Sequence, residues 1–545
     1  MQRFRRLALV AATALAVITT GCSNNTTVDS PVTAYDNDAS SLQMVVGSEQ
    51  AEVITKLVQP WCDSQHISCK ITQMGSVDQA RLLQTGDAPY DAFWFASTAF
   101  EGIGDTQHKL QGVQPMFSTP IVFAGWKSEM DKLGLTGKSD VPIQDVLNAV
   151  ESGKTRTWVT NPAQSNSGAT VLLGFLNSFA GNGPGVPLTA AQLDSPQVKD
   201  GITRFAHAFD HTPPSTGTLM DQCVANPNDC RTLFTYEDLV IQTNKDLVAK
   251  GKEPLYAVYP KGALAISNAP LGFLPHGGDA NAKKKATFDA LQQYLLSQEA
   301  QNQLLDLGRR PISSIGLNLP NAPQNVFNPA WGIKTNSNEQ QITFPNADVT
   351  NTALDRYQTT YRKPTDMVYC LDESGSMADN GKWTSLQQAV KVLFTPVQAA
   401  QYKLQLGPQD NTVILAYSGG IDATLTVNGN DATAQANVVD QVVNHLGPDG
   451  GTSTYNCLRR AVDFFKANAG SPNKRLVTLM TDGQATDEDR GELAELKQLH
   501  APLLTIGLGS DADVDQLKSM AAATGGAYID GGDLTTMLNK ATGYR

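Results

Sequence analysis

The sequence predicts an α/β protein made of two domains. Strand-like apolar runs alternate with helix-like runs from residue 42 to about residue 320, and this alternation resumes at residue 365. A Pro- and Asn-rich segment separates the two regions. Such alternation is typical of parallel sheets covered by helices. We therefore expect α/β domains at 42–320 and 365–545, joined by a linker at 321–364.

The chain begins with an arginine-rich stretch followed by the apolar run "LALVAATALAVITTGC". This run is too short for a stop-transfer helix and is typical of a secretory signal peptide, which we place at residues 1–21. Its ending, "TTGC", resembles the lipobox of bacterial lipoproteins. The resemblance implies a lipid with several acyl chains on Cys22, including palmitate, and anchoring to the extracytoplasmic face of the cell membrane. Ordinary secretion with an incidental cysteine is the alternative.

Residues 22–41 are polar and lack periodicity, as expected of a flexible stalk between lipid and first domain. The formal net charge of the chain is −12, and the first 21 residues contain arginines but no acid. The rest of the chain is therefore more acidic still. This charge excludes nucleic acid as an expected partner.

The cysteines predict disulfides in an oxidising compartment. Cys62 precedes Cys69 by the same spacing that separates Cys223 from Cys230. Each bond would close a small loop and stabilise the fold by about 2.5 kcal/mol on the chain-entropy model. Neither pair has the closer spacing typical of zinc ligands. The remaining two cysteines, at positions 370 and 457, lie in apolar patterns that fit either a third bridge or two buried thiols.

The first domain places hydroxyl side chains where predicted strands pass into helices. Backbone N–H groups at helix starts, together with such hydroxyls, can hold an anion. Each hydroxyl could equally cap its helix. The candidate ligand-binding residues are Ser48, Ser97, Ser165, Ser167, Ser215 and Thr216.

This pattern, with "LFTYEDLVI", "YPKGALAISNAPLGFL" and the late "GRRP", resembles the type II solute-binding proteins of ABC transporters. The resemblance spans about residues 42–320. It implies a periplasmic-binding-protein-like fold of two α/β lobes hinged over a cleft. It also implies a small solute or oxyanion as ligand.

The second domain opens with "MVYCLDESGSM", in which an apolar strand ends at Asp372 and is followed by Ser374 and Ser376. Ligands bind at the carboxyl ends of strands in open parallel sheets. A carboxylate with two hydroxyls supplies hard oxygen ligands, which suit Mg²⁺ or Ca²⁺. A helix cap or Asx turn uses the same residue types, so the triplet alone does not decide between them.

Two more segments bring oxygen ligands to strand or helix ends: Thr452 in "GPDGGTST" and Asp482 in "RLVTLMTDG". Together with the triplet they resemble the metal-ion-dependent adhesion site (MIDAS) of von Willebrand factor A-type (VWA) domains. The resemblance covers residues 365–545 and implies a doubly wound, Rossmann-like fold. It also implies a cation, Mg²⁺ or alternatively Mn²⁺ or Ca²⁺, bound by Asp372, Ser374, Ser376, Thr452 and Asp482.

The VWA resemblance further implies a protein partner whose Asp or Glu completes the metal shell. Nothing in the motif is an activated nucleophile, so we expect a binding protein rather than an enzyme. We predict a lipid-anchored protein that binds a protein partner through its second domain, with small-solute binding in the cleft of the first. The alternative is the receptor of an ABC importer, with the VWA domain as a docking module.

Overall fold

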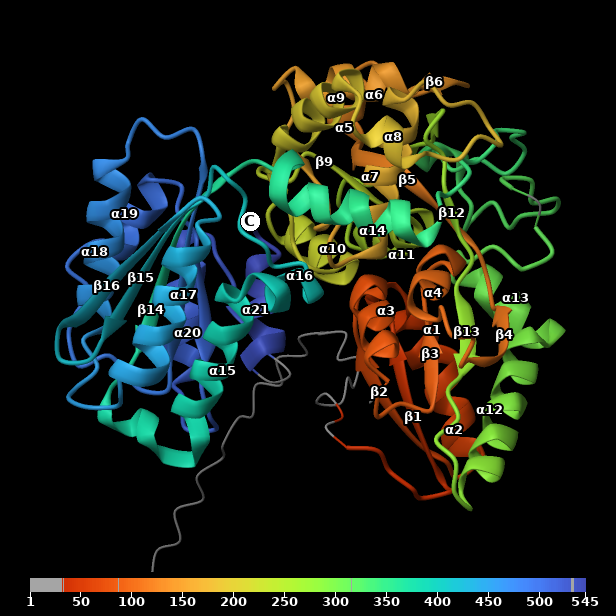
Figure 1. The fold of residues 1–545 in the computed structure, drawn as a ribbon. Coiled ribbons are helices and arrows are strands. Elements are labelled where there is room, and N and C mark those ends of the chain that lie inside the picture. The colour runs from red at the N-terminus through yellow and green to blue at the C-terminus, as the bar shows by residue number, and fades with distance from the viewer. Residues whose placement is uncertain (1–31, 33, 87, 315, 531–533) are drawn as a thin grey trace, which may run out of the picture.

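A computed structural model of the protein describes residues 32, 34–86, 88–314, 316–530 and 534–545. The expected signal peptide and Cys22 lie outside these residues. No helix within the described ranges is long and apolar enough to cross a membrane. The chain forms two α/β domains, and the N-terminal one is divided into two lobes (Figure 1).

Lobe 1 is built on a mixed sheet with strand order β2-β1-β3-β13-β4. The apolar run at Ser41–Val46 forms β1, which is buried throughout and pairs in parallel with β2 and β3. The strands are β1 (Ser41–Val46), β2 (Ser68–Gln73), β3 (Ala92–Trp94), β4 (Gln111–Pro115) and β13 (Pro270–Phe273). The helical elements are η1 (Ser48–Gln50), α1 (Ala51–Val53), η2 (Ile54–Val58), α2 (Gln59–Ser64), α3 (Ser76–Thr85), α4 (Thr98–Gly104), α12 (Asn281–Leu296) and α13 (Gln298–Asp306).

Lobe 2 is built on a second mixed sheet with strand order β10-β5-β9-β7-β8, to which β12 adds by pairing with β5. The strands are β5 (Thr119–Trp126), β7 (Thr157–Trp158), β8 (Phe209–His211), β9 (Thr232–Tyr236), β10 (Leu255–Val258) and β12 (Ile266–Ser267), beside the small pair β6 (Val141–Pro142) and β11 (Pro260–Lys261). The helices are α5 (Lys127–Lys132), α6 (Ile143–Glu151), α7 (Asn166–Phe179), α8 (Ala190–Leu193), α9 (Pro196–His207), α10 (Thr216–Ala225) and α11 (Glu237–Ala249).

The predicted strand runs form strands, but the sheets are not purely parallel as the alternation suggested. The chain passes from lobe 1 to lobe 2 between β4 and β5, and returns between β12 and β13. The strands on both sides of these crossings run antiparallel to their neighbours, since β13 pairs with β3 and β4, and β5 with β9 and β10. Hydrophobic pattern gives no strand direction, so the sequence could not reveal this.

The C-terminal domain has a six-stranded sheet with order β16-β15-β14-β17-β18-β19. All neighbouring strands in it are parallel except the edge strand β16, which runs antiparallel to β15. The strands are β14 (Thr365–Asp372), β15 (Asn411–Tyr417), β16 (Ile421–Asn428), β17 (Lys474–Thr481), β18 (Leu503–Gly507) and β19 (Tyr528–Ile529).

The central strand β14 is buried on both faces because helices cover each side of the sheet (Figure 1). Met367, Tyr369 and Leu371 pack toward α15, α17 and α21, whereas Val368 and Cys370 pack toward α18, α19 and α20. The helical elements are η5 (Gly375–Gly381), α15 (Lys382–Phe394), α16 (Pro396–Gln401), α17 (Ala432–Asp440), η6 (Gln441–His445), α18 (Thr454–Ala467), α19 (Glu492–Gln498), α20 (Val514–Thr524) and α21 (Leu534–Thr542).

The segment 321–364, which we expected as a linker, packs on the N-terminal domain along most of its length. Phe327 and Trp331 are buried in that domain's core, the latter in η3 (Pro329–Trp331). The helix formed by α14 (Ala347–Arg356) and η4 (Tyr357–Tyr361) then contacts helices of both lobes. Apolar residues scattered among Pro and Asn supply this packing, so only a few residues actually separate the two domains.

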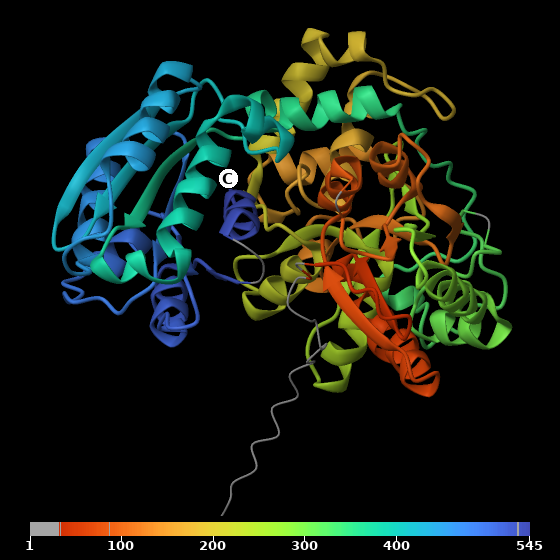
Figure 2. The same cartoon turned by 60° about the horizontal axis from the view of Figure 1, so that its bottom comes forward.

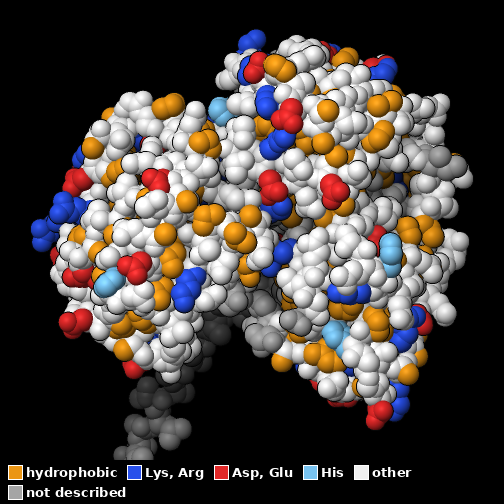
Figure 3. All heavy atoms as spheres, in the orientation of Figure 1, with side chains coloured by type: hydrophobic (Ala, Val, Ile, Leu, Met, Phe, Trp, Pro, Cys, Tyr) orange, Lys and Arg blue, Asp and Glu red, His pale blue; other side chains and the backbone are white. Residues whose placement is uncertain are grey.

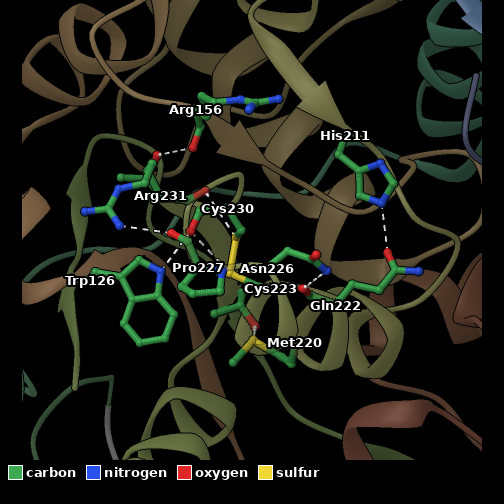
Figure 4. Close-up of a disulfide and its surroundings, with 12 residues drawn as sticks. Trp126, Arg156, His211, Met220, Gln222, Cys223, Asn226, Pro227, Cys230 and Arg231 are labelled. Atoms are coloured by element: carbon green, nitrogen blue, oxygen red, sulfur yellow. Dashed lines mark hydrogen bonds between the residues drawn. A yellow bond between two sulfur atoms is a disulfide. The ribbon is translucent and has the colours of Figure 1, made fainter. Parts of the chain in front are cut away.

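The described part of the chain contains three disulfides. They join Cys62 to Cys69, Cys223 to Cys230, and Cys370 to Cys457. The second links the end of α10 to the start of β9, where the carbonyl of Cys230 accepts a hydrogen bond of 2.8 Å from Trp126 Nε1 (Figure 4).

We expect peptide mapping of the exported protein under non-reducing conditions to find these three pairs. The six cysteines of these pairs are all bonded, so thiol alkylation before digestion should label none of them. Alkylated Cys62, Cys69, Cys223 or Cys230 in folded, exported protein would contradict the assignment.

The two domains meet where α21 and the residues after it lie against the N-terminal domain (Figures 1 and 2). Figure 3 shows the two domains in contact on one face of the molecule. Tyr544 OH accepts a hydrogen bond of 3.0 Å from Gln222 Nε2, and its ring lies 5.2 Å from the ring of His211. His211 Nε2 is 2.8 Å from Gln222 Oε1 (Figure 4). His211 thus belongs to the domain interface.

This interface predicts a pH dependence of stability. Burial, together with the nearby Lys474 and Arg156 charges, lowers the pKa of His211 to about 4 from its ordinary 6.5. Between about pH 4 and pH 6.5, His211 is protonated in the unfolded chain but not in the folded chain. The free energy of unfolding therefore falls as the pH drops below 6.5. At pH 5 the loss is about 2 kcal/mol at most.

Chemical unfolding at pH 7 and pH 5 measures this loss. We expect a smaller acid-induced loss in His211→Gln, which keeps a polar side chain but cannot become charged. The exposed His445→Gln is the matched control and should behave like wild type. Equal acid sensitivity of His211→Gln and wild type would contradict the prediction.

Candidate metal site and interlobe cleft

Asp372 lies at the carboxyl end of β14, in the middle of the C-terminal sheet. Its side chain is fully buried and both carboxylate oxygens are hydrogen-bonded. Oδ1 accepts from Ser374 N at 2.8 Å, and Oδ2 accepts from Thr481 Oγ1 at 2.5 Å. Burial raises the pKa of Asp372, the nearby Asp482 raises it further, and these hydrogen bonds oppose the shift.

Asp482 follows the neighbouring strand β17 and reaches the same edge of the sheet. Its Oδ1 accepts a hydrogen bond of 2.8 Å from Ser376 Oγ, which lies 3.2 Å from Ser374 Oγ. Asp372, Asp482 and Ser374 are buried, whereas Ser376 is exposed. The cluster therefore opens to solvent on the side of Ser376.

Thr452 reaches this cluster from the Gly-rich loop before α18. A β-carbon placed on Gly483 would lie 3.6 Å from Thr452 Oγ1 and 4.0 Å from Ser376 Oγ. Both hydroxyls therefore face the turn that carries Asp482. The structure thus places the oxygens of all five sequence-selected residues at one edge of the sheet.

Sequence analysis missed Lys382, the first residue of α15. Its Nζ lies 2.7 Å from Asp482 Oδ2 and 2.7 Å from Asp511 Oδ2. Although burial opposes it, these two hydrogen bonds raise the pKa of Lys382, so the amine is a fixed positive charge beside the cluster. The Asp511 side chain is exposed and needs no cationic partner, so no local signal in the sequence marks this pairing.

The donor set fits a hard divalent cation. The described residues contain no group of three or more His, Cys, Asp and Glu side chains that could hold a metal. The cluster instead combines two carboxylates with hydroxyls, which are ligands for Mg²⁺, Mn²⁺ or Ca²⁺ and not for thiophilic metals. A cation held there would supply open coordination positions for a carboxylate from a partner.

In the N-terminal domain, three of the selected hydroxyls bond mainly to one another. Ser167 Oγ lies 2.8 Å from Thr216 Oγ1, and Ser165 Oγ lies 3.3 Å from each of them. Thr160 Oγ1 adds a further contact to Ser167 at 2.8 Å. All four are buried. They form a hydroxyl cluster within lobe 2, at the starts of α7 and α10, and do not lie free in a groove.

The other selected hydroxyls divide between capping and the cleft. Ser97 accepts from Ala99 N at 3.2 Å and caps α4, which is the structural role its position allowed. Ser215 caps α10 through Thr218 N, but it also lines the cleft. Ser48 Oγ of lobe 1 accepts a bond of 3.1 Å from Gly217 N of lobe 2, so the lobes touch at this point.

Beyond this contact lies a cavity of about 640 Å³. Lobe 1, lobe 2 and the C-terminal domain all line it, through residues that include Ser48, Asp78, Gln164, Ser215, Asn539 and Tyr544. The cleft of the N-terminal domain is therefore bounded on one side by the other domain. No pattern in the sequence indicates this contribution.

The junction between the lobes is held by buried charges. Arg309, from "GRRP", contacts Glu52 and lies 3.1 Å from Asp238 Oδ2, and it donates a bond of 3.2 Å to the carbonyl of Glu49. Burial raises the pKa of Glu49 to about 7 and that of Asp238 to about 6. One arginine thus bonds to both lobes where the chain crosses between them.

Comparison with protein families divides the chain in the same way. Residues 42–310 match the family described as bacterial extracellular solute-binding protein. Residues 366–539 match the von Willebrand factor type A domain. Collagen alpha-1(XXI) chain from Xenopus laevis is 23% identical over 167 residues, which are 30% of this chain and 16% of that relative.

Solved structures show similarity to each domain separately. The sulfate-binding protein SubI from Mycobacterium tuberculosis is 14% identical, over 57% of this chain and 95% of that one, with a TM-score of 0.39. A periplasmic thiamin binding protein is 12% identical, over 59% of this chain and 94% of that one, with a TM-score of 0.39. A von Willebrand factor type A protein from Catenulispora acidiphila is 21% identical, over 34% of this chain and 43% of that one, with a TM-score of 0.28. The two family matches show a chain that joins a periplasmic-binding-protein-like N-terminal region to a VWA-like C-terminal region.

Proposed function

We propose that this chain is a lipid-anchored, extracytoplasmic binding protein whose VWA domain binds a protein partner through a divalent cation. The observation that supports this proposal is the set of oxygens at the end of β14, where Asp372 is buried and Ser376 is exposed. An acidic side chain of a partner would reach the cation from the exposed side. The buried carboxylates would hold the ion from within.

The side chains around the site suit binding better than hydrolysis. Ser376 donates its proton to the carboxylate of Asp482, and Lys382 is held between two carboxylates. A lysine with a raised pKa stays protonated and does not act as a general base. We therefore propose a binding role and not an enzymatic one.

Water-proton relaxation with bound Mn²⁺ tests this proposal. Mn²⁺ bound with open positions carries exchangeable water, so adding the protein to Mn²⁺ should enhance relaxation, and a Glu-containing peptide at high concentration should reduce the enhancement. The amide analogue of the peptide is the control. No enhancement, or equal responses to the acidic and amide peptides, would contradict carboxylate-mediated binding.

We also propose that the N-terminal cleft binds a small polar solute or oxyanion. Ser48 Oγ of lobe 1 meets the backbone N–H of Gly217 near the start of α10, and Ser48 and Ser215 both line the adjoining cavity. Helix N-termini favour anions. Calorimetric titration with sulfate, phosphate and molybdate, in wild type and Ser48→Ala, tests this role. Heat in wild type that is lost in the variant would support it, and the importer-receptor function would then be the one to pursue.

The lipid anchor is a separate prediction. We expect cells to incorporate labelled palmitate into the protein at Cys22, because the preceding residues resemble a lipobox. Cys22→Ser should abolish labelling and release the protein into the soluble fraction. Thr26→Ala, close to Cys22 in the expected stalk, is the matched control and should keep the label. An unlabelled wild type would contradict anchoring.

A further inference from the structure

Asn539, a buried residue of α21, bonds to both lobes of the other domain through one side chain. Its Nδ2 donates a hydrogen bond of 3.0 Å to Asp78 Oδ1 of lobe 1. Its Oδ1 accepts a bond of 2.8 Å from Gln164 Nε2 of lobe 2. Gln164 also donates to the backbone carbonyl of Asn539. One amide of the VWA domain therefore bridges the mouth of the cleft.

The residues after α21 extend this contact over lobe 2. The carbonyl of Gly543 accepts from Asn161 Nδ2 at 2.8 Å and from Thr212 Oγ1 at 3.3 Å. A β-carbon on Gly543 would lie 2.1 Å from Gln164 Oε1, so the backbone approaches lobe 2 closely there. On the lobe 1 side, the guanidinium of Arg81 lies 4.2 Å from the ring centroid of Tyr402.

The lobes themselves are in contact inside this bridge. Ser48 accepts from Gly217 N, and a β-carbon on Gly75 of lobe 1 would lie 2.1 Å from the carbonyl oxygen of Gln164 in lobe 2. Only a few chain crossings join the lobes, so separating them is a hinge motion. Such a motion would break the Asn539 bond to at least one lobe.

We propose that α21 is a clamp that holds the two lobes closed, so that opening of the cleft and release of the VWA domain are one coupled event. Coupling of this kind is reciprocal: whatever opens the lobes favours undocking of α21, and whatever displaces α21 favours open lobes. The clamp depends on neither the metal nor the identity of a solute. It makes the N-terminal domain a docking site for the chain's own VWA domain.

A cross-lobe disulfide can measure lobe closure in the full chain. A β-carbon on Gly217 would lie 3.2 Å from Ser48 Cβ, near the spacing of about 3.8 Å found in disulfides. The pair Ser48→Cys and Gly217→Cys should therefore crosslink rapidly under mild oxidation when the lobes are closed. The rate is read from the loss of free thiol by mass spectrometry, in a chain that also carries Cys22→Ser.

We expect Asn539→Leu, combined with Gln164→Ala, to slow this crosslinking about tenfold, within the usual range of coupling between sites. Hydrogen exchange of the α21 amides should accelerate in the same protein. Thr535→Ala, on the same helix but outside the cavity lining, should change neither quantity. Gln222→Ala removes the bond from lobe 2 to Tyr544 and leaves the contact to lobe 1 intact. It should therefore slow crosslinking less than the change at Asn539 does.

A second variant keeps the test decisive. Gly543→Leu places a side chain where Gln164 and the carbonyl of Lys540 leave no room, so it should force α21 away from lobe 2. Faster exchange of α21 with an unchanged crosslinking rate would overturn the proposal. So would unchanged exchange of α21 in both variants, since the named contacts would then not hold the helix.

Discussion

Asp372→Ala is expected to abolish binding of Mg²⁺ or Mn²⁺ by the full chain. The substitution deletes a ligand and also a charge that balances the ion at the buried end of β14. We expect the affinity to fall by at least about 100-fold, beyond the loss typical of removing a residue that only supports a ligand. Asp482→Ala should have a similar effect, and isothermal titration calorimetry measures both.

The fold should survive these substitutions because the sheet core on either side of β14 is unchanged. Circular dichroism should therefore match wild type. Asp515→Ala removes an exposed acid from α20 and is the matched control, with no expected change in metal binding. If wild type binds no divalent ion, or if the variants bind it as tightly, the Asp-Ser-Ser triplet is only a helix cap and the adhesion function is wrong.

Removal of the Cys370 to Cys457 disulfide is expected to destabilise the C-terminal domain. The loss should be larger than the loss that removal of either other disulfide causes in the N-terminal domain. The bond joins β14 to α18 across a sequence separation of 87 residues, and both cysteines are fully buried. On the chain-entropy model, closing a loop of this size contributes about 4.5 kcal/mol. The shorter loops closed in the N-terminal domain contribute about 2.5 kcal/mol each.

Hydrogen exchange of the β14 amides in increasing urea measures this difference. The double variant Cys370→Ala with Cys457→Ala should open at much lower urea than wild type. The matched control, Cys62→Ala with Cys69→Ala, should leave β14 unchanged because that bond lies in the other domain. Equal opening of β14 in wild type and the first variant would show that the bond contributes nothing.

Elements with strong local patterns were predictable from sequence. The run "TPIVFAGW" forms β5 over Thr119–Trp126, and the apolar stretch before the acid at position 372 forms β14. The five candidate metal-binding residues could also be expected to lie close together, because each oxygen sits beside a Gly-rich turn or a strand end. These features depend on a few neighbouring residues, which a single sequence displays.

Features that depend on distant residues were not predictable. Nothing near Lys382 reveals that Asp482 and Asp511 will meet it, and nothing in α21 reveals that Asn539 will face Asp78. The hydroxyl cluster of lobe 2 also depends on distant residues. Ser165 and Ser167 meet Thr216, which lies about 50 positions further along the chain, and a single sequence does not display that contact.

The placement of β14 has a mechanical consequence if, as proposed, the chain is anchored at its N-terminal end and a partner binds at the cation site. The strand starts at Thr365, directly after the joint where Arg362 pairs with the buried Asp410, and it ends at Asp372. Tension between an N-terminal anchor and a partner at the cation would therefore run along this one strand. Asp482 follows the parallel neighbour β17, so the share of the pull carried by this residue would shear the ladder of hydrogen bonds between β14 and β17 and would not unzip it bond by bond. The sheet would resist such a pull better than the polar contact between the domains, and that contact would part first.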